Sequence, residues 1–256
     1  MAVFFMTMNL IFLCVAGFFA AFVDSIAGGG GIISVPAFLL AGVPPHITLG
    51  TNKFSSTCAS FTSSLKFMQS GKVDLKILKF LLPFTVIGAV LGVNTVLIID
   101  AKYLNMIVLT LLLFVGIYSL FSKSIGKEDK FKGLCKKSLI LGILLAFSLG
   151  FYDGFFGPGT GSFLIFGLIG IYQFDFVRSA GNGKVMNFGS NIASLIMFAF
   201  RGQINYKLGV PVAIFMIIGA KFGTKVALKN GAKIIKPLFV TMSLCVALKI
   251  LYGAVK

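Results

Sequence analysis

Residues 22–31 read FVDSIAGGGG, and residues 151–161 read FYDGFFGPGTG. Each stretch carries an aspartate, Asp24 or Asp153, at the end of an apolar segment, and a run of glycines follows the acid. Glycine is unfavourable inside a helix, so each run predicts an interruption of regular structure. The same order of apolar segment, acid and glycine break occurs twice, and it predicts a chain built from two similar halves.

The similarity of the two halves extends well beyond these stretches. When the chain is compared with itself, one constant shift aligns Lys53 with Lys184 and several glycines with glycines, and a short insertion accounts for a slightly different shift at the two acids. Apolar matches would carry little weight in this chain, but matched Asp, Lys and Gly residues indicate an internal repeat. We assign 1–121 to a first membrane repeat, 122–137 to a basic loop and 138–256 to a second membrane repeat. The aligned glycines are Gly50/Gly181, Gly71/Gly202, Gly88/Gly219 and Gly92/Gly223.

The composition is that of a membrane protein. Hydrophobic residues make up 57% of the 256 positions, charged residues make up 12%, and the mean hydropathy is +1.00. Soluble domains average about 45–50% apolar and about 25% charged residues. Uncharged stretches at 2–23, 80–99 and 103–121 approach the roughly 20 residues that a helix needs to cross a bilayer. These stretches are continuously apolar, which excludes the alternating pattern of a membrane β-barrel.

Each half is expected to contain the same series of helices. An apolar helix ends at the acid, the glycine break follows, and two short apolar segments precede two longer helices. The fold class is therefore all-α: a polytopic membrane protein with two homologous helical repeats and short or broken helices near mid-membrane. The expected segments are 10–24, 32–43, 54–68, 77–99 and 103–121 in the first half, and 139–153, 162–171, 185–200, 208–228 and 237–254 in the second.

The charges predict an orientation. The net charge is +16, but the basic residues lie mostly between apolar stretches, which argues against nucleic acid as a partner. No Lys or Arg precedes Lys53, whereas the segment 122–137 is strongly basic and is therefore expected in the cytoplasm. If each half crosses the membrane an odd number of times, the halves are inverted and the lysines at 225–236 also face inward. An even number would place these lysines outside, so we expect inverted repeats.

Several motifs resemble those of a known family. The stretch 22–36, FVDSIAGGGGIISVP, resembles the first signature of the sulfite exporter TauE/SafE family, and GTNK at 50–53 with GKVD at 71–74 resembles the second. The second half repeats the pattern as DGFFGPGTG at 153–161 and NGK at 182–184, but its tetrad GNGK lacks the threonine of GTNK. The resemblance covers essentially the whole chain. It implies a multi-pass carrier of the bacterial inner membrane for small anions, often sulfite or organosulfur acids.

The candidate site lies where the two repeats carry the same polar residues. Glycines allow consecutive N–H groups to converge on an anion, and a helix that begins there adds its positive end. Lys53 and Lys184, expected to open the second short segment of each half, would supply countercharge, although a lysine at a helix end also commonly extends towards the membrane surface. The predicted substrate-binding residues are Gly28, Gly29, Gly30, Gly31, Thr51, Asn52, Lys53, Gly157, Gly159, Gly161, Asn182 and Lys184.

The two aspartates allow two interpretations. A carboxylate at membrane depth is a functional candidate, here as a proton carrier. It equally suits a structural role, in which it accepts backbone N–H groups at the glycine break. Because lysines and glycines are expected nearby, we expect Asp24 and Asp153 to stay charged and to act mainly as anchors, and a structural carboxylate can also take up a proton.

The remaining polar residues exclude other kinds of site. A single histidine, His46, and four scattered cysteines predict no metal site, no cofactor and no disulfide framework. The chain lacks the P-loop motif of ATPases and lacks a nucleophile paired with a base, so no catalytic residue is predicted. We expect a secondary carrier whose partners are a small anion and the lipid bilayer, with a homo-oligomer left open. The alternative is a channel or a membrane assembly subunit without carrier activity.

Overall fold

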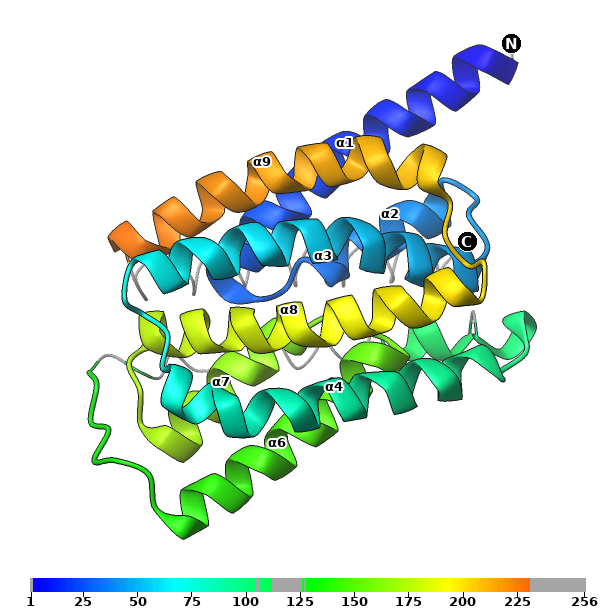
Figure 1. Cartoon of the computed structure of the whole chain (residues 1–256). Coiled ribbons are helices and arrows are strands. Elements are labelled where there is room, and N and C mark those ends of the chain that lie inside the picture. The colour runs from blue at the N-terminus through cyan, green and yellow to red at the C-terminus, as the bar shows by residue number, and fades with distance from the viewer. Residues whose placement is uncertain (1, 105, 112–125, 127, 231–256) are drawn as a thin grey trace.

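The computed structural model describes residues 2–104, 106–111, 126 and 128–230, and the elements in this part of the chain are α-helices (Figure 1). The predicted helix 237–254, most of 103–121 and residues 122–125 and 127 of the basic loop 122–137 lie outside the described residues. The helices are α1 (Ala2–Ala27), α2 (Gly31–Leu40), α3 (Pro45–Gln69), α4 (Leu75–Leu97), α6 (Lys136–Phe155), α7 (Thr160–Tyr172), α8 (Phe176–Phe200) and α9 (Tyr206–Asn230).

Four of these helices are long and apolar enough to cross a membrane. The spans are Met8–Ala27 in α1, Leu75–Leu97 in α4, Lys136–Phe155 in α6 and Tyr206–Asn230 in α9. Large apolar side chains such as Ile87, Leu144 and Ile214 are exposed on α4, α6 and α9, as expected for helices whose outer faces contact lipid rather than water. The prediction of a helical membrane protein is confirmed.

The two central helices differ from the prediction. The sequence predicted short apolar segments at 54–68 and 185–200, but α3 and α8 are each 25 residues long. They begin earlier because the tetrads GTNK and GNGK continue the helix instead of interrupting it. Both helices bury a stripe of polar side chains, which lowers their hydropathy and concealed their length. The buried polar residues are Thr48, Thr51, Asn52, Lys53, Ser55, Thr57, Ser60, Ser63 and Ser64 in α3, and Ser179, Asn182, Lys184, Asn187, Ser190, Asn191 and Ser194 in α8.

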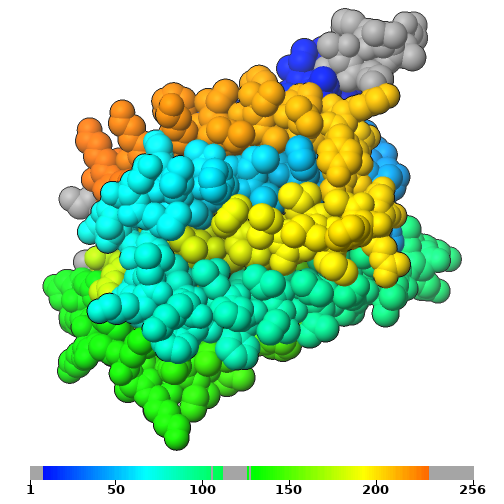
Figure 2. All heavy atoms as spheres, viewed as in Figure 1, coloured from blue at the N-terminus to red at the C-terminus, as the bar shows by residue number. Residues whose placement is uncertain are grey.

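The apolar helices enclose the polar ones in pairs. α1 packs along α9, α4 packs along α6, and α3 and α8 lie side by side between these two pairs (Figure 1). In the space-filling view of Figure 2, side chains of α3 and α8 fill the middle of the visible face between α9 and α4. The short helices α2 and α7 join each outer helix to its polar neighbour. The polar stripes therefore face the interior of the molecule, where a site between the halves was predicted.

Paired glycines allow the outer helices to approach closely. A Cβ atom at Gly88 or Gly92 of α4 would lie 2.3 or 2.1 Å from a carbonyl oxygen of α6, and one at Gly219 or Gly223 of α9 would lie 2.2 Å from a carbonyl oxygen of α1. Real Cβ atoms do not come this near to backbone. The Gly-x-x-x-Gly motifs therefore serve helix packing, as small residues commonly do in membranes.

Arg178, for which the repeat offers no counterpart, forms an ion-pair cluster at one end of the helical bundle. Its guanidinium donates to Asp74 at 2.7 Å and to Asp129 at 2.9 Å, and it stacks on the rings of Phe174 and Phe131. Burial raises the pKa of the Asp129 carboxyl group. Hydrogen bonds from Arg178 and from the Phe131 N–H lower it by more, so the pKa lies below its ordinary value. The Arg178–Asp129 ion pair therefore stabilises the fold fully at pH values above the ordinary pKa of a carboxyl group. This contribution is lost as the pH falls through the lowered pKa of Asp129.

We expect Arg178→Lys to destabilise the protein by about 1–3 kcal/mol, because a lysine cannot bridge two carboxylates or stack on two rings as a planar guanidinium does. The measurement is the midpoint of thermal unfolding in detergent. Arg201→Lys is the matched control, since Arg201 lies exposed at the other end of α8 and forms no ion pair with any described residue. Equal midpoints for both variants would show that the cluster contributes nothing.

Candidate anion site

The two glycine breaks meet in the interior. The backbone of Gly28, Gly157 and Gly159 is left-handed, with φ of 79°, 97° and 85°, a conformation that glycine adopts readily. A Cβ at Gly28 would lie 2.2 Å from the backbone of Gly161, and the N–H of Ser162 donates to the Gly28 carbonyl at 3.1 Å. The break between α1 and α2 is thus joined to the break between α6 and α7, and the amino ends of α2 and α7 face one another.

Several N–H groups at these helix starts are free to bind a ligand. Gly31, Gly159 and Gly161 line a cavity, and within the described part of the chain their N–H groups meet no acceptor. The N–H of Gly30 instead donates to Asp24 Oδ1 at 3.2 Å. Free N–H groups at the starts of two helices, together with the positive ends of the helix dipoles, favour a bound anion.

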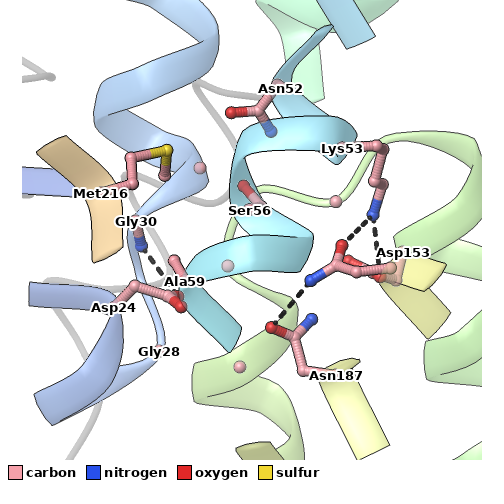
Figure 3. A pocket seen from close by; sticks show the side chains of 15 residues that line it. Asp24, Gly28, Gly30, Asn52, Lys53, Ser56, Ala59, Asp153, Asn187 and Met216 are labelled. Carbon is pink, nitrogen blue, oxygen red and sulfur yellow. Dashed lines mark hydrogen bonds and ion pairs between the residues drawn. The ribbon is translucent and has the colours of Figure 1, made fainter. Parts of the chain in front are cut away.

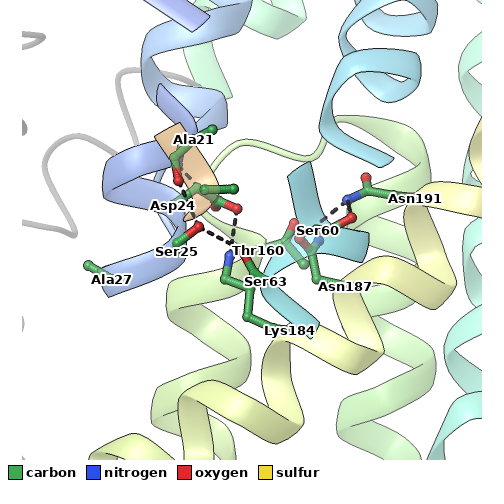
Figure 4. Close-up of polar contacts among 12 residues, drawn as sticks. Ala21, Asp24, Ser25, Ala27, Ser60, Ser63, Thr160, Lys184, Asn187 and Asn191 are labelled. Carbon is green, nitrogen blue, oxygen red and sulfur yellow. Dashed lines mark hydrogen bonds and ion pairs between the residues drawn. The ribbon is translucent and has the colours of Figure 1, made fainter. Parts of the chain in front are cut away.

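The predicted lysines and aspartates pair across the two halves. Lys53 Nζ lies 2.8 Å from Asp153 Oδ2, and Lys184 Nζ lies 2.5 Å from Asp24 Oδ2. The side chains of Lys53 and Asp153 are 4% and 2% exposed, whereas that of Asp24 is 22% exposed. Figure 3 shows the first pair beside the cavity and Figure 4 shows the second. Each half thus supplies the lysine that neutralises the acid of the other half.

This arrangement corrects the predicted position of the lysines. Lys53 and Lys184 do not open a helix but lie within α3 and α8, more than a turn from either end. A lysine in the middle of a buried helix cannot extend to the membrane surface, so the alternative interpretation as surface-directed lysines is wrong. The two lysines are also not free to neutralise a bound anion, because the ammonium group of each already has a carboxylate partner.

Asparagines complete the cavity. The amide of Asn52 is 6% exposed, its Oδ1 has no hydrogen-bond partner, and it lines the cavity. Asn191 Oδ1 accepts from Lys53 Nζ at 2.9 Å, and Asn191 Nδ2 donates to Asn187 Oδ1 at 3.3 Å (Figure 3). A buried acceptor without a partner is unusual in a native structure, and Asn52 Oδ1 can accept a hydrogen bond only from a group that donates one.

The sequence interpretation missed Asn187, Asn191 and Ser56, although a signal was present. Asn187 follows Lys184 by less than one helical turn, and Asn191 follows Asn187 by about one turn, so the three lie on one helix face. Ser56 holds the same position after Lys53 in α3, and the cavity is lined by both Ser56 and Asn187. These residues were overlooked because the prediction began the helices at the tetrads. Residues three and four apart share a helix face only when the helix continues through all of them.

Not every predicted residue reaches the cavity. Thr51 Oγ1 accepts a hydrogen bond from the Asn205 N–H at 2.9 Å, and Asn182 Oδ1 accepts one from the Asp74 N–H at 2.9 Å. Threonine in GTNK and asparagine in GNGK therefore make the same kind of contact to a loop of the other half, which explains how the two tetrads can differ. Gly29 and Lys184 also do not line the cavity. The predicted residues that line it are Asp24, Gly28, Gly30, Gly31, Asn52, Lys53, Asp153, Gly157, Gly159 and Gly161.

The cavity is small. Its volume is about 30 Å³, which corresponds to roughly one or two water molecules. Met216 of α9 and Ala59 of α3 form its apolar wall. In this conformation the site has donors and charges suited to an oxyanion but little space.

Comparisons with known proteins agree with this architecture. The model of the family described as "Sulfite exporter TauE/SafE" matches residues 13–250. A probable membrane transporter protein of Haemophilus influenzae is 39% identical over 242 residues, which is 94% of each chain. A probable membrane transporter protein of a Sinorhizobium species is 38% identical over 94% of this chain and 92% of its own. The probable membrane transporter protein YfcA of Escherichia coli K12 is 32% identical over 92% of this chain and 87% of its own.

No solved structure matches the chain. The family model nevertheless covers nearly all of the sequence, including both glycine breaks and both lysines. Together with the four candidate spans, these similarities show that the chain is a multi-pass membrane protein. It belongs to the sulfite exporter TauE/SafE family of membrane transporters.

Proposed function

We propose that this protein is a secondary carrier for a small anion, either a sulfite-like oxyanion or an organosulfur acid. The observation that carries the proposal is the convergence of hydrogen-bond donors on one buried cavity. The free N–H groups of Gly31, Gly159 and Gly161 border it, and so does the ammonium group of Lys53, which is held by Asp153 and Asn191. An oxyanion accepts several hydrogen bonds at once, so it matches this set of donors better than a cation or an apolar molecule does.

A carrier also fits the position of the cavity better than an enzyme or a channel does. The cavity lies where the two halves meet, as expected for a protein that exposes one site alternately to each side. Ion pairs and glycine contacts between the halves border this one small cavity, and a single site of this kind suits a carrier better than a continuous pore does. The polar groups at the cavity are amides, the Ser56 hydroxyl, and an amine and carboxylates held in ion pairs. Among the described lining residues no histidine or free carboxylate stands beside Ser56 as a base, which suits binding rather than nucleophilic chemistry.

We further propose that the two halves are inverted repeats. Two features support this. First, equivalent helices make equivalent contacts across the halves: α4 of the first half packs on α6 of the second, and α9 of the second half packs on α1 of the first. The glycines at these two contacts occupy matching positions. In Figure 1, α3 and α8 run in opposite directions, and so do α4 and α9. An inverted pair of halves provides the two-sided symmetry that alternating access needs.

Single cysteines introduced at Asp100 and at Lys229 test the orientation. In a variant without the native cysteines, we expect Lys229→Cys to react only with reagent on the cytoplasmic side and Asp100→Cys only from the opposite side. The reason is that the basic end of α9 follows the positive-inside rule while the turn around Asp100 is nearly neutral. The measurement uses a membrane-impermeant maleimide on sealed vesicles of each orientation. Labelling of both sites from one side would contradict the inverted arrangement.

Transport itself is tested with the purified protein in sealed proteoliposomes. The probes are labelled sulfite, sulfate and methanesulfonate, and a simple amino acid serves as a control compound. A carrier gives saturable uptake, and an excess of unlabelled anion on the inside accelerates entry of the label by counterflow. A channel gives uptake that does not saturate and shows no counterflow. An assembly subunit moves none of the probes, and either result would refute the proposal.

A further inference from the structure

The charged side chains at the cavity cancel one another. Lys53 pairs with Asp153, and Lys184 pairs with Asp24, so the site has no net charge before a substrate arrives. An uncompensated charge in a poorly solvated interior is strongly unfavourable. An anion that entered alone would leave the site with a negative charge. The proposed function therefore requires that one positive charge enter with each monovalent anion.

Asp153 is the acid that competes directly with a bound anion. The cavity is lined by Lys53 but not by Lys184, so an anion can reach only the first ammonium group. Lys53 Nζ already contacts Asp153 Oδ2 at 2.8 Å. Two anions cannot both remain charged against one buried ammonium group, so binding of the substrate requires that the Asp153 carboxylate lose its charge.

Asp153 is also the less firmly held of the two acids. Asp24 has two partners, since Oδ2 faces Lys184 and Oδ1 accepts the Gly30 N–H. Within the described residues Asp153 has only Lys53 as a partner. Asp153 is therefore the acid with fewer contacts to give up, and none remains once Lys53 has turned to another anion.

A proton suits the site better than a metal cation does. A proton adds no volume and needs a single acceptor, which the Asp153 carboxylate at the cavity can provide, whereas a sodium ion needs several oxygen ligands in addition to the space that must open for the anion. The ionisable groups that face Asp153 are few. Among the residues that the structure describes, Asp24 from α1 and Lys53 from α3 line the cavity with Asp153, and α9 presents Met216 there. Tyr152 precedes Asp153 on α6, and its hydroxyl is bonded to the Pro158 carbonyl. Lys184 from α8 is paired with Asp24.

We propose that the cavity binds one monovalent oxyanion together with one proton, the anion replacing the Asp153 carboxylate at Lys53 Nζ and the proton residing on Asp153. This proposal rests on the transport function proposed above. The O–H bond on Asp153 is the only covalent bond made on loading, and it is broken on release. One anion and one proton together carry no net charge, so the transport cycle is electroneutral.

The first test uses the wild-type protein in proteoliposomes that enclose a pH-sensitive dye, with the membrane potential clamped by potassium and valinomycin. Methanesulfonate is the main probe, because this strong-acid anion keeps the same charge across the pH series. We expect its entry to acidify the interior by one proton per anion and to be insensitive to the imposed potential. Uptake without acidification, or uptake that requires sodium, would overturn the proposal while leaving the transport function intact. Absence of uptake for every anion in the screen would instead refute the transport function.

Two variants assign the proton to a residue. With Asp153→Asn we expect anion entry without acidification, and the accumulation should change about tenfold for each ~60 mV of imposed potential, because the anion then moves alone. The double variant Asp24→Asn/Lys184→Gln removes the other ion pair without changing the net charge, and it should still acidify the interior. Asp100→Asn, which replaces an exposed helix-capping acid outside the site, should behave as wild type.

The opposite pattern would refute the assignment. If Asp153→Asn still carries one proton per anion, or if the double variant alone loses the proton, Asp153 is not the proton carrier. Size-exclusion chromatography in detergent shows whether each variant is folded. Should Asp153→Asn fail to fold, the double variant remains decisive, because loss of acidification in that variant would place the proton on Asp24.

Discussion

Replacement of Lys53 by alanine is expected to weaken binding of the transported anion by roughly 10- to 150-fold, the usual effect of removing a hydrogen bond to a charged group. Lys53 is the ammonium group that lines the cavity, and its side chain is 4% exposed. Water therefore cannot replace it as a partner for the anion. The measurement is the half-saturation concentration of anion uptake in proteoliposomes, corrected for the amount of folded protein.

Two further variants separate binding from folding. Lys53→Ala leaves Asp153 as an unpaired buried acid, and such a change commonly costs about 3–5 kcal/mol of stability. The double variant Lys53→Gln/Asp153→Asn replaces the ion pair with neutral side chains of similar size and should fold, yet it should not recover anion binding. Lys66→Ala is the matched control in the same helix, because Lys66 is only half-buried, lies outside the cavity and donates to the Lys221 carbonyl. If the double variant takes up the anion with wild-type affinity, Lys53 does not bind the anion and serves only to neutralise Asp153.

Replacement of Gly28 by alanine is expected to cost about 2–5 kcal/mol of stability and to abolish transport. The added Cβ would lie 2.2–2.3 Å from backbone atoms of Gly161 and Ser162, and backbone cannot yield as a flexible side chain does. Forced overpacking costs about 1–3 kcal/mol, and the left-handed φ of 79° adds roughly 1–2 kcal/mol for a residue other than glycine. The two glycine breaks would be pushed apart, and the paired starts of α2 and α7 would no longer converge on the cavity.

Gly42 provides a control with the same backbone conformation. Its φ is also 79°, but nothing lies within 4 Å of the position where its Cβ would stand. Gly42→Ala therefore carries only the conformational penalty, and the difference between the two variants measures the contact between the breaks. The measurement is the thermal midpoint in detergent together with anion uptake. If both variants behave alike, close contact between the breaks is not required.

Much of the architecture was predictable from the sequence because it depends on local composition. Continuous apolar segments without charges identify helices that cross a membrane, whatever their neighbours. The glycine runs identified where α1 and α6 end, since glycine breaks helices through its own backbone freedom. The Gly-x-x-x-Gly motifs in α4 and α9 are also a local signal, since small residues at this spacing allow helices to approach closely. The repeated positions of Asp, Lys and Gly pointed to the residues that border the cavity.

The length of α3 and α8 was not predictable in this way. Their helices are stabilised by polar side chains that face another helix of the same protein, so low hydropathy does not indicate a helix end. Gly50 and Gly181 lie inside these helices because the carbonyls of Gln203 and Lys72 approach them too closely for any side chain. That approach involves residues distant in the sequence, and only the packed structure reveals it.

By itself the sequence determined that this is a helical membrane protein, where the glycine runs end α1 and α6, and which acids and lysines occupy matching positions in the chain. The tertiary structure decided how these charges combine. Lys53 pairs with Asp153 and Lys184 with Asp24, each across the two halves, and a sequence pattern cannot indicate partners that lie so far apart in the chain. The physical reason is that a charge at membrane depth must find an opposite charge, but the packing of α3 and α8 between the outer helices selects which one it meets.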